Sequence, residues 1–235
     1  MDRKTALVTG GSSGMGLAIA KKLRSMGLEV IIFDIQSPPE GFSYFHVDIR
    51  NDAQIQEALS QIPRIDILVN NAGVYFEKYL EDTTNDEIDR MVDINIKGSY
   101  LMTRNALSKI KETSGSIVFI ASCLGLVPEL TSPLYCATKA GLIMLTKCLA
   151  QQYADCGVRI NCVLPGPIDT PLLQNSFPDE AAERRCAARI PLKRIGQPEE
   201  VANMVAFLVS EDAGYITGGA FPVDGGVSSS SLYSK

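Results

Sequence analysis

The stretch TGGSSGMG, residues 9–16, decides how this chain is interpreted. Its glycines Gly10, Gly14 and Gly16 follow a G-x-x-x-G-x-G spacing, and glycine tolerates the tight backbone conformations of such a turn. The preceding segment, 3–8, is apolar and of strand length. The following segment, 17–27, has apolar residues at helical spacing and ends on Gly27. The sequence therefore predicts a strand, a glycine turn and a helix.

A turn of this kind is a candidate phosphate site. The free N–H groups and the positive dipole end of the helix point at the turn, where the glycines leave the backbone open. The alternative is a glycine-rich turn of any α/β protein, without a ligand.

A carboxylate follows the turn at the distance that a dinucleotide-binding fold requires. Residues 29–34, EVIIFD, predict a second strand that ends in Asp34, eighteen residues after Gly16. A carboxylate there accepts hydrogen bonds from both ribose hydroxyls and repels a 2′-phosphate. We therefore expect NAD rather than NADP, because no cation stands at the neighbouring positions Ser12, Ser13, Ile35 and Gln36. The alternative is that Asp34 only caps a loop.

Composition excludes several classes of protein. A chain of 235 residues with 46% hydrophobic and 21% charged residues predicts one globular domain, 1–235. The net charge of −5 argues against nucleic acid and anionic membranes as partners. Residue 1 leads directly into the first strand, so a cytoplasmic location is expected. The six cysteines form no C-x-x-C pair, which predicts reduced thiols and no metal site.

Strand and helix patterns alternate along the whole chain. Strands are predicted within 42–49, 65–73, 115–121, 158–166 and 221–226, and helices within 52–62, 84–112 and 132–157. This alternation predicts a single α/β domain, doubly wound, with a parallel sheet and helices on both faces.

Two segments depart from a regular repeat. Residues 35–44 contain two prolines and no helical period, so this crossover is expected to be a loop. The polar insertion 170–202 follows the carboxyl end of a strand, and we expect a substrate lid at about 170–196. The tail 228–235 is expected to be mobile at its tip.

Three side chains could carry chemistry near the predicted carboxyl edge of the sheet. Tyr135 and Lys139 lie four residues apart, which places them on one face of a helix. Ser122 directly follows a buried strand. By themselves these features also fit a surface helix and a serine that begins a loop.

Six motifs occur together and in a fixed order, namely TGGSSGMG, NNAG at 70–73, NIKG at 95–98, Ser122, YCATK at 135–139 and PGPIDT at 165–170. In these motifs the chain resembles the short-chain dehydrogenase/reductase family. The resemblance implies a catalytic tetrad of Asn95, Ser122, Tyr135 and Lys139. It also implies cofactor contacts from Gly10, Ser12, Ser13, Gly14, Met15, Gly16, Asp34, Asp48, Ile49, Asn71, Ala72, Gly73, Tyr135, Lys139, Pro165, Gly166, Ile168 and Thr170. Asp48 could equally cap the helix that follows it.

The chemistry of these side chains agrees with the implied roles. Alcohol oxidation needs a base and ketone reduction the corresponding acid, and Tyr135 can serve both directions. Lys139, with the positive nicotinamide ring, is expected to lower the pKa of Tyr135. Ser122 can stabilise charge on the substrate oxygen, and on the family's pattern Asn95 holds a water. The single histidine, His46, is expected to be structural.

The expected activity is hydride transfer between NAD(H) and a small-molecule alcohol or ketone, catalysed by a homotetramer or homodimer as the resemblance implies. The alternatives are a dihydrodiol dehydrogenase, a 3-oxoacyl-carrier-protein reductase, and a non-catalytic NAD-binding regulatory protein. Val74 to Phe76, the segment after Ser122, and the lid are expected to line the substrate pocket. Charges there, at Glu129, Arg184, Arg185 and Arg189, could instead form a solvated surface.

Overall fold

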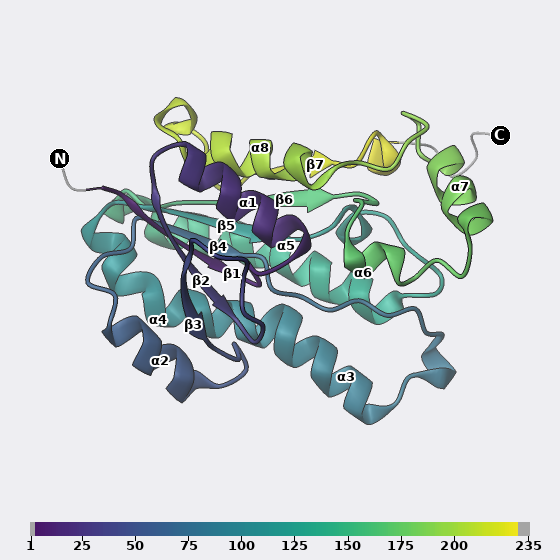
Figure 1. Cartoon of the computed structure of the whole chain (residues 1–235), viewed down its shortest axis with the longest axis horizontal. Coiled ribbons are helices and arrows are strands. Elements are labelled where there is room, and N and C mark those ends of the chain that lie inside the picture. The colour runs from purple at the N-terminus through teal and green to yellow at the C-terminus, as the bar shows by residue number, and fades with distance from the viewer. Residues whose placement is uncertain (1–2, 230–235) are drawn as a thin grey trace.

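A seven-stranded parallel sheet organises the chain (Figure 1). A computed structural model describes residues 3–229. The strand order is β3-β2-β1-β4-β5-β6-β7. The strands are β1 (Thr5–Thr9), β2 (Glu29–Asp34), β3 (Ser43–His46), β4 (Ile67–Asn70), β5 (Ser116–Ile120), β6 (Arg159–Pro165) and β7 (Ala220–Val223). The order reverses beside β1, so the carboxyl ends of β1 and β4 form the switch point at which doubly wound sheets bind their ligands.

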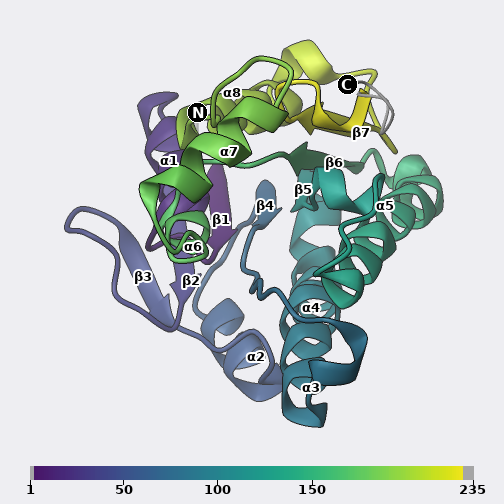
Figure 2. The ribbon, with the colours of Figure 1, turned by 90° about the vertical axis from the view of Figure 1, so that its right-hand side faces the viewer.

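Helices cover both faces of this sheet, as Figures 1 and 2 show, and the predicted doubly wound fold is confirmed. One face carries α1 (Gly14–Ser25) and α8 (Pro198–Val209). The opposite face carries α2 (Asp52–Ser60), α4 (Ser99–Glu112) and α5 (Pro133–Tyr153). The remaining helices are α3 (Asn85–Val92), α6 (Pro171–Gln174) and α7 (Glu180–Arg189). Alternate residues of β1 enter the two cores, since Ala6 and Val8 pack toward α1 and Leu7 packs toward α2.

The glycine turn has the conformation that its sequence predicts. Gly10 and Gly14 have φ angles of 63° and 51°, a region that side chains disfavour. Gly16 lies so close to the backbone that a Cβ would collide with the carbonyl oxygen of Gly10. The turn thus needs glycine at these three positions, and α1 begins at Gly14 as expected.

The predicted helix over 84–112 has an internal defect. Its central residues, Asp93–Gly98, form a π-helical turn between α3 and α4. The sequence pattern shows no signal for this turn, because the flanking residues keep their helical spacing. By contrast, the connection between β2 and β3 contains no helix, so the predicted loop crossover is confirmed.

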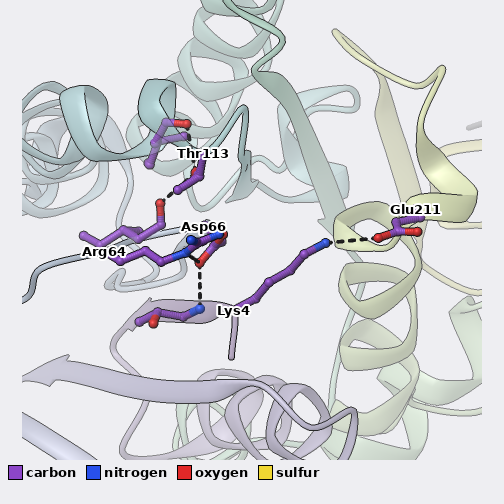
Figure 3. Close-up of polar contacts among 8 residues, drawn as sticks. Lys4, Arg64, Asp66, Thr113 and Glu211 are labelled. Atoms are coloured by element: carbon purple, nitrogen blue, oxygen red, sulfur yellow. Dashed lines mark hydrogen bonds and ion pairs between the residues drawn. The ribbon is translucent and has the colours of Figure 1, made fainter. Parts of the chain in front are cut away.

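Polar contacts connect the residues at the amino ends of the strands, which we call the amino edge of the sheet; the carboxyl ends form its carboxyl edge (Figure 3). The Asp66 carboxylate accepts from Thr5 N at 2.8 Å and pairs with the Arg64 guanidinium at 2.6 Å. Thr113 donates its hydroxyl to the Ile65 carbonyl, and Lys4 pairs with Glu211. These contacts join the starts of β1 and β4 to α4 and to the chain after α8.

The described part of the chain also shows the state of the cysteines and whether it contains membrane-spanning helices or metal clusters. All six cysteines are free thiols. Within residues 3–229 no helix is both long and apolar enough to cross a bilayer, and no cluster of side chains is arranged to hold a metal ion. The expected mobile tip, 230–235, lies outside the described residues.

Candidate active site

The amino end of α1 lacks a side-chain cap. Ser13 occupies the N-cap position without a side-chain hydrogen bond, and no acidic residue stands in the first turn. In contrast, the first turns of α2, α3 and α7 are capped by the side chains of Asn51, Thr84 and Asp179. The first N–H groups of α1 thus have no side-chain acceptor, which leaves them able to bind an anion.

The NNAG motif braces the glycine turn. The Asn71 side-chain amide donates to the carbonyls of Thr9 and Gly10 at 3.0 and 2.9 Å. The Thr9 hydroxyl accepts from the backbone N–H groups of Asn71 and Ala72. A Cβ on Gly10 would lie 2.8 Å from the Cα of Ala72. The turn and the end of β4 are therefore packed so closely that only glycine fits between them.

The PGPIDT segment approaches the same turn from the other side. A Cβ on Gly14 would lie 3.4 Å from the Thr170 side chain. Thr170 also begins α6, where its hydroxyl accepts from Leu173 N and donates to the Ile168 carbonyl. Pro165 ends β6, and Gly166 packs against Asp224. The glycine turn, NNAG and PGPIDT thus lie side by side at the carboxyl edge.

Asp34 ends β2 beside the glycine turn. Its carboxylate accepts from the backbone N–H of Ser12 and from that of Gln36, each at 3.0 Å. The second contact is a local loop cap, which is the alternative that the sequence left open. Neither hydrogen-bond partner of the Asp34 carboxylate is a cation, and within residues 3–229 no ion pair includes Asp34. Asp34 is half-buried, so its side chain is open to solvent beside the glycine turn.

The loop after β3 contains Asp48 and Ile49. Asp48 pairs with the Arg50 guanidinium, and this pair holds the pKa of the Asp48 carboxyl below its usual value. The suggestion that Asp48 caps the next helix is wrong, because Asn51 accepts from the first N–H groups of α2. Ile49 is buried against Gly98.

Ser122, Tyr135 and Lys139 converge at the end of β5. Ser122 precedes a short 3-10 turn and accepts from Leu124 N at 3.1 Å. Tyr135 lies in the first turn of α5, and the Lys139 Nζ lies 5.5 Å from the centre of its ring. Lys139 is 4% exposed, and its Nζ donates to the Ile120 carbonyl at 2.9 Å. The buried ammonium is thereby held beside the Tyr135 ring.

Asn95 reaches this group from the π-helical turn. It is fully buried, and its side chain exchanges two hydrogen bonds with the backbone of Val74. A Cβ on Gly73 would lie 3.3 Å from Asn95 Oδ1 and 3.5 Å from Lys139 Nζ, so Gly73 separates the two side chains. A π-turn re-aims the side chains of a helix, and here Asn95 points toward the end of β4.

Burial dominates the electrostatics of the site. It raises the pKa of Tyr135 above its ordinary value, and a hydrogen bond with Ser122 opposes that shift. We expected Lys139 to lower this pKa, but the pKa is raised, and the group that opposes the effect of burial is Ser122 rather than Lys139. Burial also lowers the pKa of Lys139 to about 8. At neutral pH, Tyr135 is therefore a neutral phenol that can donate a proton.

The two ends of the insertion that we expected to form a lid lie next to each other in the structure. Ile168 and Gly196 form an isolated bridge, and Asp169 N donates to the Gly196 carbonyl. Between them, α6 and α7 lie in front of the strands in Figure 2. Arg184, Arg185 and Arg189 are exposed, as the solvated-surface alternative expects.

His46 and Glu129 belong to different parts of the molecule. His46 is exposed on β3, where its Nδ1 lies 3.1 Å from the Tyr44 hydroxyl. Glu129 is half-buried in the loop before α5.

Sequence reasoning missed one contact in the expected substrate pocket. The centres of the Tyr75 and Tyr135 rings lie 4.9 Å apart. Sixty residues separate the two tyrosines, and no local pattern signals such a contact.

Comparison with known proteins identifies the class of protein that this fold and site define. Residues 10–228 match the family model described as enoyl-(acyl carrier protein) reductase. The chain therefore belongs to the short-chain dehydrogenase/reductase family, whose members are oxidoreductases that bind a nicotinamide cofactor.

Two curated relatives cover almost the whole chain. The chain is 34% identical over 237 residues to a 3-oxoacyl-[acyl-carrier-protein] reductase of Rickettsia felis, covering 95% of this chain and 96% of the relative. It is also 34% identical over 243 residues to a meso-2,3-butanediol dehydrogenase of Serratia marcescens, covering 97% of this chain and 96% of the relative.

Solved structures agree in fold. An aldohexose dehydrogenase of Thermoplasma acidophilum, in ligand-free form, superposes with a TM-score of 0.94 at 34% identity, covering 99% of this chain and 97% of that one. A 3-ketoacyl-(acyl-carrier-protein) reductase of Brucella melitensis, complexed with NADH, superposes with a TM-score of 0.88 at 33% identity, covering 96% of this chain and 98% of that one.

Proposed function

We propose that the protein transfers a hydride between NAD(H) and a secondary alcohol or ketone, with Tyr135 as the acid and base. The observation that carries this proposal is the convergence of Ser122, Tyr135 and Lys139 at the carboxyl edge, beside the uncapped amino end of α1. A protein that only bound the cofactor would have no need of Ser122, Tyr135 and Lys139 together.

The residues at the switch point between β1 and β4 suit a dinucleotide. The N–H groups at the start of α1 suit a pyrophosphate, because Gly14 and Gly16 leave the backbone open and no side chain competes for it. Asp34 suits the adenosine ribose, and its negative charge, with no neighbouring cation, favours NAD over NADP. Asp48, Ile49 and residues 71–73 would border the adenosine, and Ile168 and Thr170 the nicotinamide end. When bound, the cofactor supplies the hydride acceptor or donor.

Proton transfer is the task of the protein's own side chains. In ketone reduction, Tyr135 gives its phenolic proton to the substrate oxygen, and Ser122 donates a hydrogen bond to the same oxygen. Lys139 stabilises the phenolate that remains, since its ammonium is fixed beside the ring. Asn95 holds the loop after β4 against this group and is the candidate for the water-binding role.

The substrate is proposed to be a small, uncharged alcohol or ketone. The segments that border Tyr135, Val74 to Phe76 and the chain after Ser122, are largely apolar. A 3-oxoacyl thioester is the second candidate, favoured by the Rickettsia and Brucella relatives. We further propose a single domain, a lid at about 170–196, a cytoplasmic location, and a homotetramer or homodimer.

The proposed function is tested by absorbance at 340 nm. The purified protein is offered NAD or NADP with a panel of secondary alcohols, diols, aldohexoses and a 3-oxoacyl thioester. Turnover that requires NAD supports the proposal. If NAD binds in calorimetry but no member of the panel turns over, the non-catalytic binding protein becomes the better account.

A further inference from the structure

The loop after β4 contacts the start of α5 through an aromatic pair. The rings of Tyr75 and Tyr135 have centres 4.9 Å apart and planes inclined at 75°, an edge-to-face arrangement. Such pairs are attractive beyond their buried area and prefer a defined geometry. The Tyr75 ring therefore forms a wall against one side of the Tyr135 ring.

Polar contacts fix the Tyr75 ring at its far end. Its hydroxyl donates to Glu77 Oε1 at 2.8 Å and accepts from Ser132 Oγ at 3.3 Å. Ser132 stands at the N-cap of α5, three residues before Tyr135. Tyr75 is thus anchored to its own loop and to the helix that carries Tyr135.

The backbone of the same loop makes a second attachment. Lys78 N donates to the Thr131 carbonyl at 2.6 Å, just before α5 begins. In addition, Val74 exchanges hydrogen bonds with the buried Asn95 side chain. Residues 74–78 are therefore tied at both ends, which gives the Tyr75 ring a rigid support.

Tyr135 needs such support more than a residue inside the helix would. It lies in the first turn of α5, where only Pro133 and Leu134 of that helix precede it. A side chain at this position has less of its own helix to pack against. The second ring supplies a neighbour that a swing of the phenol would have to displace.

We propose that Tyr75 is a positioning residue, whose ring holds the Tyr135 phenol in the orientation required for proton transfer. The role depends on the ring, and the hydroxyl contributes by anchoring that ring to Ser132 and Glu77. This inference rests on the proposed function, because it assigns Tyr75 a task in a reaction that Tyr135 performs.

The test compares Tyr75→Ala and Tyr75→Phe with the matched variants Tyr79→Ala and Tyr79→Phe. Tyr79 belongs to the same loop region and is 53% exposed. Turnover is followed at 340 nm with NAD and the best alcohol of the panel, and NAD binding is followed by calorimetry. We expect Tyr75→Ala to lower kcat on the order of 10- to 100-fold with NAD affinity unchanged. Tyr75→Phe keeps the ring and loses less, and both Tyr79 variants resemble the parent protein.

A second readout needs no substrate. Tyrosine labelled with carbon-13 at Cζ reports the pKa of each phenol by NMR, and the Tyr135→Phe variant assigns the Tyr135 signal. Because burial raises the pKa of Tyr135, loss of the Tyr75 ring admits water and lowers that pKa. The pKa stays unchanged in Tyr79→Ala.

The two hypotheses fail differently. If Tyr135→Phe keeps full turnover, the proposed function fails, whatever the Tyr75 variants do. If Tyr135→Phe is inactive but Tyr75→Ala matches Tyr79→Ala in both kcat and the Tyr135 pKa, then Tyr75 only fills space and the inference is overturned.

Discussion

The carboxylates at the two edges of the sheet differ in their burial and in their partners. At the amino edge, Asp66 is 5% exposed, paired with Arg64, and bonded to the start of β1 (Figure 3). At the carboxyl edge, Asp34 is half-buried, and its carboxylate accepts from the backbone N–H groups of Ser12 and Gln36. A carboxylate paired with a cation serves the stability of the fold, whereas one without such a partner is available to a ligand.

The same contrast holds for the other polar groups. Thr113 at the amino edge donates to a carbonyl of the connection before β4 and closes that edge. At the carboxyl edge, the start of α1 has no side-chain cap, and neither has the start of α5, which carries Tyr135. Substitutions at the amino edge should therefore change folding, and those at the carboxyl edge should change binding or turnover.

Tyr135→Phe should have the largest effect, at the carboxyl edge. The variant keeps the ring but loses the proton, so we expect turnover to fall on the order of 10²- to 10⁴-fold. NAD affinity by calorimetry and the denaturation midpoint should stay unchanged. Near-normal turnover would contradict the assignment of the acid and base.

Asp66→Asn should have the next largest effect, at the amino edge. It removes the charge that binds Arg64 and Thr5 N, and we expect a loss of about 1.5–3 kcal/mol in the free energy of unfolding. Urea denaturation measures this loss. The activity per folded molecule should not change; a selective loss of activity would break the division between the two edges.

Asp34→Ala sharpens the comparison through cofactor choice. Loss of the carboxylate removes the ribose hydrogen bonds and the repulsion of a 2′-phosphate, so the preference for NAD over NADP should fall on the order of tenfold. Calorimetry with both nucleotides measures it. Glu40→Ala, an exposed carboxylate of the loop after β2, is the control. An unchanged preference in Asp34→Ala would show that this carboxylate only caps its loop.

The smallest effect is a pH dependence of stability. Burial raises the pKa of the Asp66 carboxyl, but Arg64 and Thr5 N outweigh it and the net pKa is lowered. The stabilisation is therefore complete above the unfolded pKa of about 4 and is lost as pH falls through the lower folded pKa. Urea denaturation from pH 6 to 3 should show the parent protein converging on Asp66→Asn. A constant gap between the two would contradict this account.

Local patterns predicted most of the fold. The glycine turn, the alternating elements and the helix-free crossover after Asp34 follow from short-range signals in the sequence. The π-helical turn at Asp93–Gly98 could not be predicted, since its residues continue a helical pattern. Asp48 remained an alternative cap of α2 in the sequence, because Asp and Asn share the same capping chemistry; the structure shows Asn51, three residues later, in that role.

For the site, the sequence identified the residues but not their electrostatics. Ser122, Tyr135 and Lys139 were brought forward by their motifs, and the structure places them together. Their electrostatics could not be predicted, because the pKa of Tyr135 depends on burial by neighbours distant in sequence. Tyr75 belongs to that set, and its ring contact with Tyr135 exists only in the folded chain.

The most direct test of the division between the edges measures NADH formation at 340 nm by the parent protein, Asp66→Asn and Tyr135→Phe. All three are assayed with the alcohol that turns over best, at equal concentrations of folded protein. We predict that Asp66→Asn matches the parent and that Tyr135→Phe is nearly inactive while still binding NAD. Equal losses in both variants, or full activity in Tyr135→Phe, would contradict the claim that the chemistry resides at the carboxyl edge.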